Sequence, residues 1–273
     1  MTTPRRLDFK VFDKPWGSPR TEPWLENSAR RNVGEVWFTP PEGAPILVKL
    51  LFTASRLSIQ VHPGDQYARE HHQSNGKTEM WHVLRAEPDA TVGLGLRSGC
   101  SQADLEAALG SDELMSMIEW LPARPGDTFF VPAGTIHAVG GGLVLCEVQQ
   151  QSDITYRLWD YGSERELHLK DGLAVSLCDA RGIRPLPQVR GPGRDLLAEC
   201  PYFETERIAV SGAASIPPRS RAAICVVLSG SGRLGGQSFR AGEAWRIPES
   251  ADPLPVSSES AVLLTTCLPE AIQ

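Results

Sequence analysis

Several features that would assign the chain to a specialised class of protein are missing. It has no run of about 18 apolar residues, so we expect no membrane-spanning helix and no membrane partner. Its first ten residues lack the apolar core of a signal peptide, so we expect a cytoplasmic protein. Basic residues (27) do not outnumber acidic ones (33), and the net charge of −6 argues against a nucleic-acid partner. A small basic pocket for an anionic metabolite remains compatible with this balance.

Paired cysteines are also missing. The chain has six cysteines, which are scattered and form no CxxC motif. This spacing is typical of reduced and mostly buried thiols, and it favours neither a disulfide framework nor a cysteine-bound metal. The residues concerned are Cys100, Cys146, Cys178, Cys200, Cys225 and Cys267.

Short apolar segments bounded by turn residues are what the chain has in abundance. With 25 glycines and 22 prolines, many of its apolar runs are only as long as a strand. Repeated short strands at this spacing predict a mainly β protein built as a sandwich or barrel. The expected strands lie at 44–52, 57–62, 80–86, 90–96, 127–132 and 142–150.

Helices are expected in three places. Residues 101–120 begin with a serine cap and carry apolar residues at helical spacing, with a break at Gly110. Residues 167–180 read as a shorter helix, and residues 65–72 as one or two helical turns. The first of these segments forms a small helical insert in the β framework.

The composition divides the chain into two lobes. Residues 181–200 are rich in proline, glycine and arginine, which predicts a linker between a lobe at 1–180 and a smaller β lobe at 201–273. A weak repeat relates 124–134 to 240–250, because both contain glycine, an acidic residue, an apolar pair and proline in that order. Only the first copy is followed by a histidine, so we expect a metal site in the first lobe alone.

The stretch "GDTFFVPAGTIHA" places Gly126, Pro132, Gly134 and His137 in one register. The glycines and the proline indicate a tight turn, after which the histidine begins the next strand. This arrangement resembles the second sequence motif of the cupin superfamily. The resemblance implies a double-stranded β-helix, or jelly-roll, barrel.

A metal site is predicted from four side chains. Gln60 and His62 are two apart in an expected strand, so both point to the same face. Glu79 opens a neighbouring strand, and with His137 it can converge on them. Two imidazoles, a carboxylate and an amide oxygen suit zinc or another divalent first-row metal with an open position for substrate.

Longer segments resemble the type I mannose-6-phosphate isomerases. They include "LSIQVHPGDQYARE", "GKTEMWHVL" and "VPAGTIHAVGGGLVLCEVQQQSDITYRLWDYG", with "KPWGSP" and "VGEVW" nearer the start. The resemblance runs from about residue 10 to 175 and continues more faintly beyond. It implies one zinc ion per chain, bound by Gln60, His62, Glu79 and His137. It also implies that mannose 6-phosphate and fructose 6-phosphate interconvert through an enediol.

The resemblance extends to substrate-contacting residues. It points to Lys49, Ser58, Lys77 and Arg157 for the phosphate group, and to Glu147 and Arg157 for catalysis. Glu147 is our candidate for the base that moves the carbon-bound proton. The alternatives are a structural hydrogen bond for Glu147 and an ion pair with Asp153 or Asp160 for Arg157. Lys49 interrupts an apolar strand, where a charge requires a partner.

Two other functions fit the same ligand set. The chain could be a non-catalytic cupin that binds a sugar phosphate, or a metal-dependent cupin enzyme on another substrate, such as an iron dioxygenase. The phosphate-binding candidates count against a dioxygenase. Met80 and His82 depart from the residues usual in the type I mannose-6-phosphate isomerases beside the glutamate, and such neighbours could alter the surroundings of the ligand. The pattern specifies no oligomeric state.

Overall fold

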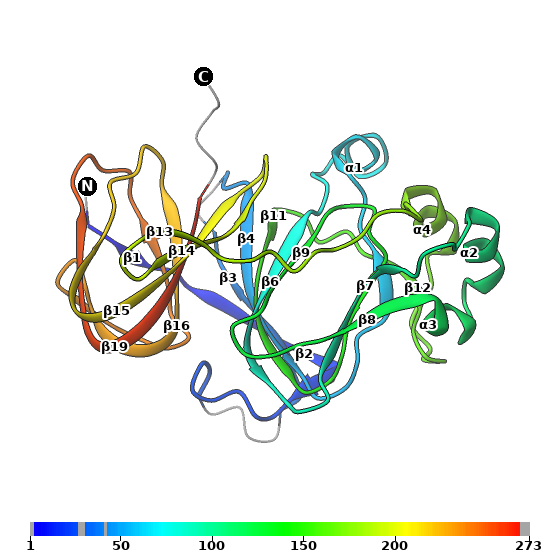
Figure 1. Cartoon of the computed structure of the whole chain (residues 1–273), viewed down its shortest axis with the longest axis horizontal. Coiled ribbons are helices and arrows are strands. Elements are labelled where there is room, and N and C mark those ends of the chain that lie inside the picture. The colour runs from blue at the N-terminus through cyan, green and yellow to red at the C-terminus, as the bar shows by residue number, and fades with distance from the viewer. Residues whose placement is uncertain (1–2, 27–30, 41–42, 268–273) are drawn as a thin grey trace.

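The computed structural model describes residues 3–26, 31–40 and 43–267, and it is mainly antiparallel β-sheet arranged in two lobes (Figure 1). The predicted short strands at 44–52, 57–62, 80–86, 90–96, 127–132 and 142–150 are all present. None of the helices in the described ranges combines the length and the apolar character needed to cross a membrane.

A six-stranded sheet forms the centre of the molecule. Its two long central strands, β4 and β11, pair along eight residues each, and every residue of both is buried. The strand order is β2 (Phe9–Ser18), β3 (Val33–Phe38), β4 (Ile46–Thr53), β11 (Leu143–Gln150), β6 (Glu79–Ala86) and β9 (Thr128–Val131).

A five-stranded sheet packs against one face of this central sheet. Trp81 and Leu145 of the central sheet pack in one cluster with Val92 and Val139 of the five-stranded sheet. The two sheets therefore enclose a barrel-like interior, which holds the site described below. The strand order is β12 (Tyr156–Trp159), β5 (Ile59–Val61), β10 (His137–Val139), β7 (Thr91–Leu96) and β8 (Ile118–Pro122).

The second lobe is built on an eight-stranded sheet. Its longest strands, β15 and β19, pair along most of their length. The order is β1 (Arg5–Arg6), β18 (Ala244–Ile247), β16 (Ala223–Leu234), β19 (Leu254–Cys267), β15 (Glu204–Ile216), β14 (Arg194–Glu199) and β13 (Gln188–Gly191), and β17 (Gln237–Arg240) pairs with β16.

The structure differs from the predicted linker at 181–200. Residues 188–199 form the hairpin of β13 and β14, and β14 continues into the second sheet by pairing with β15. The glycines that suggested a linker instead form the hairpin turn, where Gly193 has a φ of +66°. Near the other end of the chain, β1 pairs with β18, so residues 5–6 belong to the second lobe's sheet.

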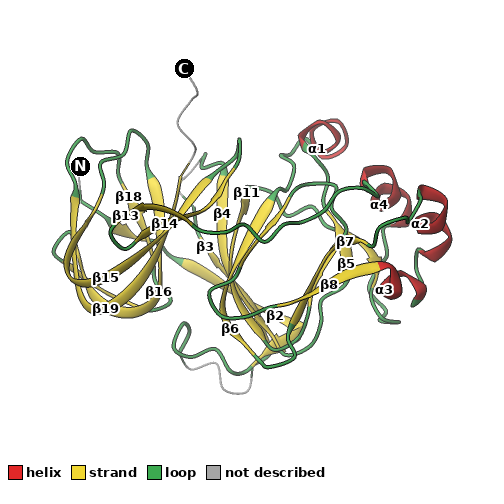
Figure 2. Cartoon of the chain, viewed as in Figure 1, coloured by secondary structure: helices red, strands yellow, loops and turns green. Residues whose placement is uncertain are grey.

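The helices gather at the far end of the first lobe (Figure 2). They are α1 (Asp65–His72), α2 (Gln102–Ala108), α3 (Glu113–Met117) and α4 (Leu169–Val175). Ser101 caps α2 through a capping box with Asp104, as expected, and Gly110 separates α2 from α3. The helical prediction is wrong for residues 118–120, which begin β8 because Ile118 pairs with Leu96.

The two lobes share a hydrophobic core. Val48 and Val148 lie on the face of the central sheet that points away from the barrel interior, and they pack with Val226 and Leu264 of the second lobe. Because strand residues alternate between faces, Met80 belongs to this shared core as well. The central sheet is thus buried on both faces, and only one of them faces the site.

Candidate metal centre and active site

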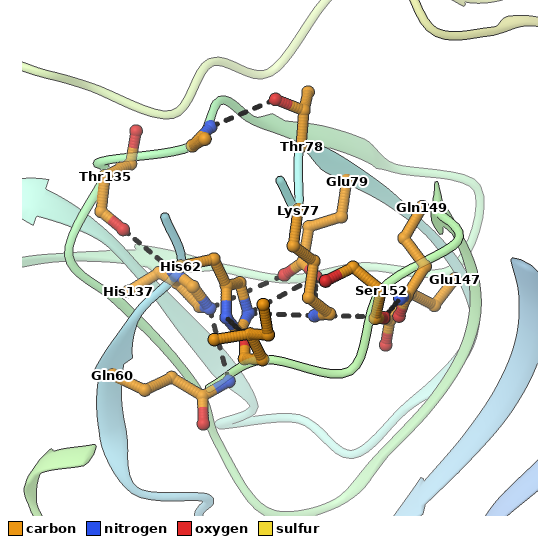
Figure 3. Close-up of polar contacts among 12 residues, drawn as sticks. Gln60, His62, Lys77, Thr78, Glu79, Thr135, His137, Glu147, Gln149 and Ser152 are labelled. Carbon is orange, nitrogen blue, oxygen red and sulfur yellow. Dashed lines mark hydrogen bonds and ion pairs between the residues drawn. The ribbon is translucent and has the colours of Figure 1, made fainter. Parts of the chain in front are cut away.

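Three strands bring the predicted metal ligands together. His62 follows β5, Glu79 opens β6, and His137 opens β10. Their ligand atoms all lie within 4.8 Å of one another, and all three side chains are buried (Figure 3). Two imidazoles and a carboxylate at this separation fit a divalent first-row metal ion.

The turn before His137 depends on Gly134. This glycine has a φ of +84°, and its N–H donates to the carbonyl of His62 at 2.8 Å. A Cβ atom added to Gly134 would lie 2.8 Å from the side chain of Leu177. The glycine therefore permits both the backbone conformation and the close packing that place His137 beside His62.

Both imidazoles are oriented by backbone carbonyls. His62 Nδ1 donates to the carbonyl of Ile154 at 2.8 Å, and His137 Nδ1 donates to that of Thr135 at 2.9 Å. The protons therefore lie on Nδ1, so both Nε2 lone pairs face the cluster. Burial lowers the pKa of His62 and brings that of His137 to about 4. Both rings are neutral at physiological pH, as metal ligation requires.

Gln60 lies at the edge of this cluster. Its backbone is paired with His137 in neighbouring strands, and its amide nitrogen is 3.2 Å from His137 Nε2. Turning the amide by 180° would place its oxygen at the same point, where it could join the other ligands. Ser58 donates its hydroxyl to the Gln60 amide oxygen at 3.2 Å.

A buried network of two lysines and two glutamates adjoins the ligands. Lys77 Nζ is 2.8 Å from His62 Nε2 and 3.4 Å from Glu147 Oε1, and it also contacts the Glu79 carboxylate (Figure 3). Lys49 Nζ lies 3.9 Å from Glu147 Oε1 and 4.2 Å from the centre of the Trp37 ring. The charge that interrupts β4 therefore has a carboxylate partner, as its position in an apolar strand required.

Burial sets the protonation properties of this network. It raises the pKa of the Glu147 carboxyl and lowers the pKa of Lys49. Burial also acts to lower the pKa of Lys77, but attraction to Glu79 and Glu147 outweighs it, so the pKa is raised. Lys77 is therefore a cation, and Glu147 is a stronger base than an exposed glutamate.

A cavity of about 330 Å³ opens beside the cluster. Seven of the nine predicted site residues line it, while His62 and His137 are the two that do not. The seven are Lys49, Ser58, Gln60, Lys77, Glu79, Glu147 and Arg157. The structure thus brings all the predicted site residues to one place.

The cavity also has lining residues that the sequence analysis did not single out. Lys14 and Glu35 form an ion pair of 3.2 Å, and Arg165 and His168 also line the cavity. Arg165 Nε donates to Asp160 at 2.7 Å, so Asp160 is not the partner considered for Arg157. In the described part of the chain, the Arg157 guanidinium forms no ion pair.

The expected influence of Met80 and His82 on the ligands is not seen. Both point to the face of β6 opposite Glu79, since strand residues alternate. His82 Nδ1 is 3.0 Å from the hydroxyl of Thr128, and Met80 packs in the core shared by the lobes. The departures at these positions therefore lie on the face of β6 that points away from the ligand candidates.

Two facing antiparallel sheets around a buried His, Glu, His cluster that could hold a metal ion define a barrel of the cupin type. Over 201 residues the chain is 35% identical to mannose-6-phosphate isomerase ManA of Bacillus subtilis, covering 70% of this chain and 63% of ManA. It is 33% identical over 224 residues to "Probable mannose-6-phosphate isomerase GmuF" of the same organism, covering 76% of this chain and 71% of GmuF. The chain belongs to the mannose-6-phosphate isomerase family.

Solved structures confirm the cupin fold. The crystal structure of mannose 6-phosphate isomerase from Bacillus subtilis superposes with a TM-score of 0.86 at 24% identity, covering 97% of this chain and 99% of that one. A variant of phosphomannose isomerase from Salmonella typhimurium gives a TM-score of 0.74 at 16% identity over the same shares. No family model matches the chain.

Proposed function

We propose that the protein interconverts mannose 6-phosphate and fructose 6-phosphate, with one zinc ion held by Gln60, His62, Glu79 and His137. The observation that carries this proposal is the position of Glu147. Its buried carboxyl lines the same cavity as the ligand cluster and lies 3.4 Å from Lys77 Nζ. A proton-transfer group beside a metal site is what an aldose–ketose isomerisation requires.

The reaction moves one proton between two neighbouring carbons of the sugar. Glu147 takes the proton from C2 of the aldose, the C–H electron pair forms the C1–C2 double bond, and the C1 carbonyl electron pair moves to O1. The hydroxyl proton passes from O2 to O1, and Glu147 returns its proton to C1 as the C2 carbonyl forms. Its raised pKa brings it closer to neutral pH, where a base works best. Bound zinc would stabilise the negative charge that develops on the C1 and C2 oxygens.

The phosphate group needs a cation at the other end of the cavity. Arg157 is the candidate for this cation, because it lines the cavity and its guanidinium has no ion pair among the described residues. Ser58 also lines the cavity. Lys49 and Lys77 are engaged with Glu147 and Glu79, so their predicted phosphate contacts would be made from within that network. We place this reaction in cytoplasmic carbohydrate metabolism.

The experiment compares the purified protein with His137→Ala. A coupled assay measures fructose 6-phosphate formation, and elemental analysis measures bound zinc. We expect the variant to lose its bound zinc. Its turnover should fall at least about a thousandfold, because a ligand and the metal are both removed. His71→Ala, on the exposed side of α1, serves as the matched control and should behave like wild type.

Three results would contradict the proposal. Zinc-loaded wild-type protein that binds mannose 6-phosphate without turning it over would be a non-catalytic sugar-phosphate-binding protein. Iron in place of zinc, with oxygen uptake, would indicate a different cupin enzyme. Full turnover in His137→Ala would remove the ligand cluster from the mechanism.

A further inference from the structure

His168 is joined to Arg157 by two reciprocal hydrogen bonds. The backbone N–H of His168 donates to the carbonyl of Arg157 at 2.8 Å, and the backbone N–H of Arg157 donates to His168 Nδ1 at 3.3 Å. These two bonds hold the half-buried His168, the residue before α4, beside Arg157 at the edge of β12. Both residues line the site cavity.

The bond from Arg157 determines the tautomer of the His168 ring. An Nδ1 atom that accepts a hydrogen bond carries no proton, so the proton of the neutral ring lies on Nε2. In the part of the chain that the structure describes, Nε2 of His168 has no hydrogen-bond partner. His168 lines the cavity, and its Nε2–H is a donor that the described part of the protein leaves unused.

His168 lies at the far end of a row of residues that begins at the metal-ligand candidates. Arg157 and His137 pair with Gln60 from opposite sides, so Arg157, Gln60 and His137 form a row across the sheet. Adjacent strands lie about 4.8 Å apart, which puts the backbone of His168 roughly 10 Å from that of Gln60. The metal ligands thus lie at one end of the row and His168 at the other.

Two other cations that line the cavity are already paired, Arg165 with Asp160 and Lys14 with Glu35. Asp153 also lines the cavity and forms no ion pair among the described residues. An anionic group entering the cavity opposite the metal cluster would therefore meet Arg157 and the Nε2–H of His168. A hydrogen bond from a neutral donor to an ionised acceptor is stronger than one between neutral groups.

We propose that His168 is a further phosphate-binding residue, whose Nε2–H donates to the phosphate of the hexose 6-phosphate beside Arg157. This inference rests on the proposed function, which supplies the substrate. It assigns a substrate contact to a histidine that the sequence pattern does not single out. It also explains why the Nδ1 atom is occupied by a backbone donor, since that bond fixes the proton on Nε2.

Two substitutions separate this role from a structural one. His168→Asn retains an acceptor near the Nδ1 position, which can keep the bond from Arg157, but it loses the Nε2–H donor. His168→Gln retains a donor near the Nε2 position and loses the Nδ1 acceptor. His71→Asn, on exposed α1 outside the cavity, is the matched control.

The experiment measures binding of sorbitol 6-phosphate to the zinc-loaded proteins by calorimetry. This ligand has the phosphate but no carbonyl, so it binds without being isomerised. We expect His168→Asn to raise Kd about 10- to 100-fold, as for loss of one hydrogen bond to a charged group. KM for mannose 6-phosphate should rise by the same factor with kcat within about threefold, and the control should match wild type.

The decisive quantity is the Kd of His168→Asn divided by that of His168→Gln. A ratio of about five or more supports the phosphate contact, and a lower ratio overturns it, because a purely structural residue would suffer more from loss of the Nδ1 bond. Wild-type protein that neither binds sorbitol 6-phosphate nor isomerises mannose 6-phosphate would instead overturn the proposed function, and this inference with it.

Discussion

Replacing Glu147 by glutamine should remove most of the turnover while leaving the metal site in place. The residue is 4% exposed and lies in the centre of β11, between Lys49 of β4 and Trp81 of β6. Glutamine has nearly the same shape, but it cannot accept the proton from C2. A positioned general base contributes roughly 10²- to 10⁴-fold, so we expect kcat to fall about a thousandfold, equivalent to about 4 kcal/mol.

Two measurements check this prediction. A coupled assay gives kcat, and incubation of fructose 6-phosphate in D₂O followed by NMR shows whether deuterium enters the sugar through the base. Glu147→Gln should show neither turnover nor deuterium incorporation, while it binds zinc like wild type. The exposed substitution Glu164→Gln is the matched control. A zinc-loaded Glu147→Gln protein that keeps more than about a tenth of kcat would refute the role of Glu147 as base.

Three further predictions concern stability. Burial lowers the pKa of His82 from 6.5 to about 4, with a smaller effect from Arg207, so the unfolded chain binds the proton first as pH falls. Urea unfolding measures the free energy of unfolding at pH 7.5 and at pH 5. Between these two values it should drop by about 2 kcal/mol more in wild type than in His82→Gln. Equal drops in the two proteins would be inconsistent with a buried neutral ring. Lys49→Met removes one cation from beside Glu147 and should lower the free energy of unfolding by about 3 kcal/mol in the same assay. The same substitution in a Glu147→Gln background should lower it by less. Equal decreases in the two backgrounds would show that Lys49 and Glu147 are not coupled. Gly134→Ala should lower the free energy of unfolding by about 1 to 3 kcal/mol and should weaken zinc binding. Unchanged zinc affinity would show that this turn does not position His137.

Much of the barrel was predictable because its signals are local. Turn residues bound short apolar runs, and alternation along each strand assigns side chains to faces. Gln60 and His62 share a face for this reason, and the turn at Gly134 places His137 next to them. The same alternation explains why Lys49 meets Glu147 across two paired strands.

The parts that were not predictable depend on contacts between distant segments. Residues 188–199 have a linker-like composition, yet they form strands because β15 offers an edge for pairing. Residues 118–120 follow a helical pattern but pair with β7 instead. In both cases tertiary pairing outweighs local propensity.

The outer end of the cavity was missed for a related reason. Arg165 and His168 come from the segment between β12 and α4, and α4 (Leu169–Val175) is shorter than the helix predicted at 167–180, so His168 lies just outside it. Lys14 meets Glu35 because β2 and β3 pair. The cluster of His62, Glu79 and His137 was predictable from the spacing of its residues. The residues that line the cavity beyond Arg157 could be identified only from the folded chain.

The central claim is that the cluster holds zinc for an isomerisation, and one measurement tests it most directly. Purified protein is assayed for conversion of mannose 6-phosphate to fructose 6-phosphate before chelation, after chelation, and after zinc is added back, with bound zinc measured at each stage. We predict that turnover follows zinc content, disappears on chelation, and returns at one zinc ion per chain. Turnover that survives complete removal of the metal, or its absence with one zinc bound, would contradict the account.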